Sequence, residues 1–131
     1  MDQGSLVTEQ IEAGARFVNE FAKYTPVQTA FWLKATADNQ WFLYVAGDRI
    51  GDSGIRTAYD EVIRIAATTP DPWLDPFQIK VMDTNKPVAK AVMRIQEEYP
   101  GSLPTRYHGP PLGGLSIEEV YIYPLPNCVS A

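Results

Sequence analysis

The chain has 131 residues, of which 45% are hydrophobic and 21% charged, a composition typical of one globular domain rather than of a disordered chain. The formal net charge of −5 argues against a protein that follows nucleic-acid phosphates, because that role needs clustered Lys and Arg. The single cysteine, Cys128, excludes an intramolecular disulfide and a cysteine-based zinc site, and it suits the reducing cytoplasm.

No stretch approaches the roughly 20 consecutive apolar residues of a membrane-spanning helix. The first residues contain no basic segment, and Leu6-Val7 is followed at once by polar residues, so we expect no signal peptide. These features predict a cytoplasmic protein without membrane contact. We expect one domain over residues 1–131, with residues 1–6 and 127–131 frayed, and no pattern indicates a cofactor.

The first half of the chain predicts a helix followed by a hairpin. Thr8 is the expected N-cap of a helix that runs to about Lys23, and Pro26 disfavours helical backbone just after it. Two strands, residues 27–36 and 40–46, are joined at Ala37-Asp38-Asn39, where Asp and Asn tolerate tight-turn backbone. This hairpin is the element around which the rest of the sheet is expected to form.

The hairpin register decides which side chains share a face of the sheet. A three-residue turn at 37–39 places one aliphatic set together, namely Phe31, Leu33 and Ala35 opposite Val45, Leu43 and Trp41. A two-residue turn shifts the register by one residue and exchanges the two sets of the second strand. We prefer the three-residue turn, because it groups the smooth aliphatic residues and sends the amphipathic aromatics to the other face.

The second half continues with alternating helices and strands. Residues 47–54 form a turn-rich loop whose glycines match neither the dinucleotide fingerprint nor the P-loop, so an N-cap loop is the simpler interpretation. A helix follows from Ile55, and residues 68–76, with three prolines, form a stiff connector. We then expect a strand from Phe77 to Val81, a helix from Pro87 to Tyr99, a short strand over 104–108, an irregular loop over 109–116 and a strand over 117–123.

This element order, α-β-β-α-β-α-β-β, predicts an α+β fold. We expect a two-layer sandwich in which three helices cover one face of a mixed, mainly antiparallel sheet of about five strands. The other face of the sheet would stay open.

His108 is the only histidine, so any histidine-based mechanism depends on it. It lies beside the 109–116 loop, where Asp48, Asp52, Glu118 or Glu119 could orient it and Ser53 or Ser116 could act as nucleophile. No signature spacing supports this catalytic interpretation, and there is no second histidine for a two-histidine metal site. A surface histidine at a strand end is the simpler interpretation.

The preferred register places five aromatic side chains on the uncovered sheet face, namely Trp32, Phe42, Tyr44, Tyr121 and Tyr123. Together they could bury on the order of 800 Å², the area that one partner contributes to a standard interface. We therefore expect a binding or assembly protein that forms a homodimer through this face. The alternatives are internal coverage of the face, a small-ligand pocket, an acidic inhibitor of a basic partner protein, and a small enzyme that uses His108.

Overall fold

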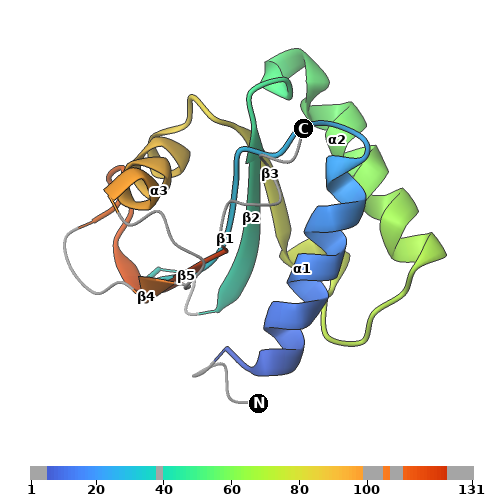
Figure 1. Cartoon of the computed structure of the whole chain (residues 1–131), viewed down its shortest axis with the longest axis horizontal. Coiled ribbons are helices and arrows are strands. Elements are labelled where there is room, and N and C mark those ends of the chain that lie inside the picture. The colour runs from blue at the N-terminus through green and yellow to red at the C-terminus, as the bar shows by residue number, and fades with distance from the viewer. Residues whose placement is uncertain (1–5, 38–39, 99–104, 107–110, 124–131) are drawn as a thin grey trace.

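The structure is a computed structural model, and it describes residues 6–37, 40–98, 105–106 and 111–123. Three helices and five strands alternate along the chain as the sequence predicts, together with one short 3-10 helix (Figure 1). Their bounds are α1 Thr8–Ala22, β1 Thr29–Ala35, β2 Trp41–Gly47, α2 Gly51–Thr68, η1 Pro76–Gln78, β3 Ile79–Asp83, α3 Pro87–Glu98, β4 Thr105–Arg106 and β5 Ile117–Ile122.

The sheet has the strand order β3-β2-β1-β5-β4. Strand β1 lies at its centre and pairs antiparallel with β2 and with β5, and β4 pairs antiparallel with β5. Only β3 is parallel to its neighbour, because α2 carries the chain back along β2 before β3 begins. The α+β class and the mixed, mainly antiparallel sheet are thus confirmed.

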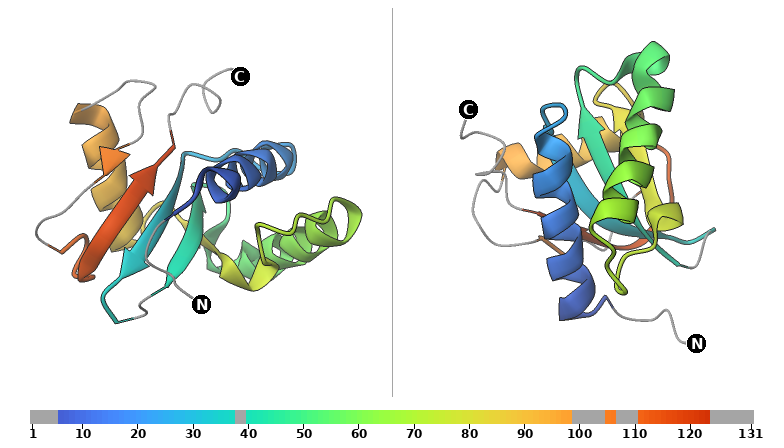
Figure 2. Two further views of the ribbon diagram at one scale, coloured as in Figure 1. Left: turned by 90° about the horizontal axis from the view of Figure 1, so that it is seen from below. Right: turned by 90° about the vertical axis from the view of Figure 1, so that its right-hand side faces the viewer.

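The expectation that all three helices cover one face is wrong. Helices α1 and α2 cover one face of the sheet, and α3 covers the other, so the fold has three layers (Figures 1 and 2). Strand β1 makes this possible, because every residue from Thr29 to Ala35 is buried and alternate side chains enter opposite cores. Ala30 and Trp32 pack with α1 and α2, whereas Phe31 and Leu33 pack with Val92 of α3.

The preferred hairpin register is also wrong, by one residue. Phe31 lies opposite Tyr44, and Trp32 lies opposite Leu43. Because side chains alternate along a strand, this shift sends Leu43 and Val45 to the α1/α2 side and Tyr44 to the α3 side.

Two loops differ from what the sequence predicts. Helix α2 begins at Gly51, whose φ of 58° is left-handed and whose amide donates to Asp83 Oδ2 of β3 over 2.8 Å. The expected strand residue Phe77 instead lies in η1 and is 83% exposed. The carboxylate of Asp75 accepts from the Phe77 amide and forms the cap that turns the chain there.

The α3 layer is sealed by a buried polar bridge and a tight turn. Gln96 accepts a hydrogen bond from Thr29 Oγ1 over 2.8 Å and donates one to the Tyr123 carbonyl over 2.9 Å, so it joins α3 to β1 and to the residue that follows β5. The turn at Gly113, where φ is 58°, packs so closely on Pro87 that a Cβ atom would strike the Pro87 carbonyl. Leu112 and Leu115 of the same turn close the edge of this core.

Candidate functional site

The five aromatic residues expected to share an open face are divided between the two sides of the sheet. Trp32 is completely buried beneath α1, and Tyr121 and Tyr123 lie partly buried on the same side of the sheet. Phe42 and Tyr44 lie on the α3 side. The one-residue shift in register and the coverage of both faces explain the error, and the predicted aromatic surface does not form.

Trp32 and Tyr123 belong to a hydrogen-bonded chain that fixes α1 on the sheet. The indole Nε1 of Trp32 donates to the Tyr123 hydroxyl over 2.8 Å, and that hydroxyl donates to the carbonyl of Ile11 in α1. Burial is the main cause that raises the pKa of Tyr123 above its ordinary value, so this phenol stays protonated and can donate. These contacts are structural, because both polar groups are satisfied inside the protein.

On the α3 side, Tyr44 stacks on Phe31 with ring centroids 5.0 Å apart. The ammonium group of Lys80 lies 4.3 Å from the centroid of the Phe42 ring. Phe42 and Tyr44 therefore both take part in packing within the α3 layer.

The catalytic hypothesis depends on a histidine outside the described part of the chain. His108 and Cys128 lie among residues that the structure does not describe. Glu118 lies on β5 and comes within 3.8 Å of the largely buried Lys34, so it pairs with a strand neighbour. Within the described ranges no group of three or more His, Cys, Asp or Glu side chains could hold a metal ion.

A feature that the sequence analysis missed is a groove between α1 and α2. It is a cavity of about 580 Å³, within the range of roughly 300–1,000 Å³ that is usual for small-molecule sites. Its lining comes from α1, α2, the connector and the start of β3, and is mainly apolar: Ala13, Phe17, Ile63, Ile65, Ala66, Ala67, Pro70, Leu74, Pro76 and Ile79, with Arg16, Asn19, Glu20, Thr69 and Asp71 as its polar members.

The apolar lining follows from how the two helices meet the sheet. Phe17 of α1 and Ile65 of α2 are buried in the same core, and Ile79 of β3 lies in the core beneath them. Farther from the sheet, Ile63 remains 53% exposed on α2. The two helices thus leave apolar surface accessible between them, although each buries its own apolar stripe.

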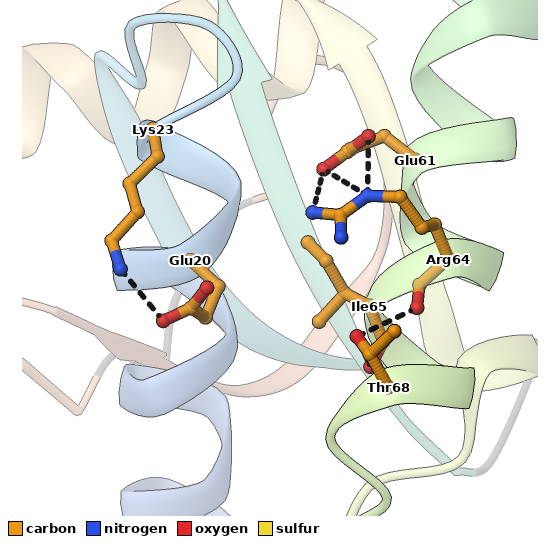
Figure 3. Close-up of polar contacts among 6 residues, drawn as sticks. All are labelled: Glu20, Lys23, Glu61, Arg64, Ile65 and Thr68. Atoms are coloured by element: carbon orange, nitrogen blue, oxygen red, sulfur yellow. Dashed lines mark hydrogen bonds and ion pairs between the residues drawn. The ribbon is translucent and has the colours of Figure 1, made fainter.

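Ion pairs lie on both of the helices that border the groove (Figure 3). On α1, Lys23 Nζ lies 3.0 Å from Glu20 Oε2. On α2, Arg64 Nε donates to both carboxylate oxygens of Glu61, over 3.1 and 3.0 Å. The hydrogen bond from Arg64 lowers the pKa of Glu61, and the same bond, with a smaller contribution from Glu20 of α1, raises the pKa of Arg64.

The connector closes one end of the groove. Arg16 Nη2 of α1 lies 2.7 Å from Asp71 Oδ2, a contact that joins residues 55 positions apart in the chain. Asp71 also accepts from the Trp73 amide over 3.0 Å. Partial burial alone would raise the pKa of Asp71, but the hydrogen bonds from Arg16 and Trp73 outweigh it and hold that pKa below its ordinary value.

A second cavity of about 470 Å³ lies beside β3, between α2 and the start of α3. Its floor is the edge of the sheet, and there the Tyr59 hydroxyl accepts a hydrogen bond from the Val81 amide over 2.9 Å. A side chain of the protein therefore already occupies an edge amide that an added strand would need. The groove between α1 and α2 is the better candidate site.

Comparisons with protein-family models, with curated proteins and with solved structures found no match to this chain. Within the described residues, no helix is both long and apolar enough to cross a membrane.

Proposed function

We propose that this protein is a non-catalytic binding protein and that it holds a small apolar molecule in the groove between α1 and α2. One observation carries the proposal, namely a cavity of about 580 Å³ whose lining is mainly apolar, on a molecule whose sheet faces are both covered. Accessible apolar surface of this kind is the usual signature of a ligand site.

A non-catalytic role agrees with the chemistry of the groove. Its acidic and basic lining residues, Arg16, Glu20 and Asp71, are all held in ion pairs. General acid–base catalysis needs a group that gains and loses a proton near neutral pH, and Asp71 is shifted away from neutrality rather than toward it. Binding is the activity that this set of side chains supports.

The test uses Nile red, an uncharged dye whose fluorescence rises in apolar surroundings. We expect wild-type protein to bind it, and Ala66→Phe to weaken binding at least about tenfold, because the new ring fills lining space in the groove. Ala22→Phe is the matched control, since Ala22 is exposed at the end of α1 and does not line the groove.

Two outcomes would contradict the proposal: no dye binding by folded wild-type protein, or equal dye affinity in Ala66→Phe and Ala22→Phe. Circular dichroism establishes that each variant is folded. If Ala66→Phe does not fold, Ala67→Phe replaces it, because Ala67 also lines the groove but is exposed.

The other interpretations from the sequence stay predictions. The aromatic surface that was predicted to form a homodimer does not exist in this fold. Light scattering after size exclusion measures whether the protein is a dimer, whichever surface would form it. The acidic inhibitor and the His108 enzyme rest on net charge and on a residue outside the described ranges.

A further inference from the structure

The charges around the groove indicate which kind of ligand it accepts. From this charge balance we infer that the groove selects an uncharged molecule over an anion or a cation with the same apolar body. This inference rests on the proposed function and specifies its substrate class.

The first step concerns the charge balance of the walls. Three charged side chains line the groove, namely Arg16, Glu20 and Asp71. Each is held in an ion pair, Arg16 with Asp71, and Glu20 with Lys23, which is not part of the lining. Figure 3 shows the Glu20–Lys23 pair on α1 and the Glu61–Arg64 pair on the neighbouring helix α2. Every charged side chain of the lining is therefore paired with an opposite charge.

The second step concerns what a charged ligand would meet. A carboxylate head group beside one of these cations would also lie beside the carboxylate that the cation already pairs with. An ammonium head group beside one of the carboxylates would likewise lie beside its cationic partner. Neither sign gains a net attraction, and each loses part of its hydration on approaching the apolar lining. An uncharged head group loses less hydration and disturbs no pair.

The third step uses the Arg16–Asp71 pair to test how the charge of a ligand affects its binding. Asp71 has the less exposed side chain of the two, at 18%, and both residues line the groove. Removing the charge of Asp71 leaves an uncompensated cation at the end of the groove, whereas removing the charge of Arg16 leaves an uncompensated anion. Both changes break the same contact, so any loosening of the connector is common to the two variants.

The experiment measures displacement of Nile red at pH 7 by three molecules with one alkyl chain: octan-1-ol, octanoate and octylammonium. For wild-type protein we expect octan-1-ol to bind at least about tenfold more tightly than either ion, with the two ions within about threefold of each other. Asp71→Asn should shift the ratio of octanoate to octylammonium affinity about tenfold toward octanoate, and Arg16→Gln should shift it by a similar factor toward octylammonium.

Glu97→Gln and Arg94→Gln are the matched controls, because they remove the same charges from exposed positions on α3, across the sheet. They should leave the affinity ratio within about twofold of wild type, since exposed charges at a distance are screened.

The two proposals fail in distinguishable ways. If octan-1-ol displaces the dye from wild type but not from Ala66→Phe, the binding function is supported. If octanoate or octylammonium then binds as tightly as octan-1-ol, or if Asp71→Asn and Arg16→Gln shift the ratio in the same direction, the inference about charge is overturned and the binding function is not. If no compound displaces the dye through the groove, the proposed function itself fails.

Discussion

The two faces of the sheet are covered in different ways. On one face a single helix, α3, lies over β1 and β5, and the Gln96 bridge and the Leu112–Leu115 turn complete the seal. On the other face α1 and α2 share the cover (Figure 2). The groove lies between these two helices. The comparison teaches that the accessible apolar surface of this protein comes from the gap between two covering helices and not from an uncovered sheet face.

The face covered by α1 and α2 itself has a sealed half and an open half. Over β1, α1 is hydrogen-bonded to Tyr123 and buries Trp32 completely. Toward α2, the side chain of Ile63 stays exposed at the groove. The sealed half over β1 thus buries its apolar side chains, whereas the half toward α2 leaves apolar surface accessible.

The largest expected effect distinguishes buried from exposed tryptophan. Trp32→Ala should lower the free energy of unfolding by about 3–5 kcal/mol, because it leaves a cavity beneath α1 and removes a partner of Tyr123. Trp73→Ala, at a side chain 46% exposed on the connector, should change it by less than about 0.5 kcal/mol. Urea denaturation followed by circular dichroism measures both. Similar losses in the two variants would contradict the placement of Trp32 in the sealed half.

The next effect compares one glycine in each of the two helices. A Cβ atom at Gly14 of α1 would lie 2.8 Å from Trp32 Nε1 and closer still to the Tyr123 hydroxyl, so Gly14→Ala should destabilise the protein by about 1–3 kcal/mol. At Gly54 of α2 the nearest atom to such a Cβ, the Arg49 carbonyl oxygen, is 3.9 Å away, and Gly54→Ala should stabilise by up to about 1 kcal/mol. Thermal unfolding of the two variants should therefore shift in opposite directions. A shift in the same direction would show that α1 does not press on Trp32 and Tyr123 as the structure describes.

Periodicity was sufficient to predict the elements but not their layers. The helices followed from apolar stripes at helical spacing, and a mixed, mainly antiparallel sheet followed from the order of helices and strands. An apolar stripe says which side of a helix is buried, but not which face of the sheet buries it. The signal for two covered faces was present in residues 41–46, which are apolar on both sides, a pattern typical of strands buried on both faces.

The candidate site could not be predicted from the sequence for a related reason. Its lining joins residues from α1, α2 and the connector, such as Arg16 and Asp71, which no local pattern links. The sequence pattern placed Phe77 at the start of a strand, and only the structure shows that it is exposed in η1 instead.

The smallest expected effect concerns the ion pair that closes the groove. Because the pKa of Asp71 is lowered in the folded protein, its contribution to stability is present above its unfolded value near 3.8 and is lost as the pH falls through the lower folded value. Asp71→Asn should therefore cost less than about 1 kcal/mol at pH 7, as is usual for solvent-screened pairs, and still less at pH 3. Glu97→Gln removes an equal charge from an exposed position on α3 and controls for the change in net charge. Free energies of unfolding for the three proteins at the two pH values decide the matter. A cost of Asp71→Asn that is the same at both would mean that the Arg16–Asp71 contact contributes nothing to holding the connector, and that the closed end of the groove is set by the backbone alone.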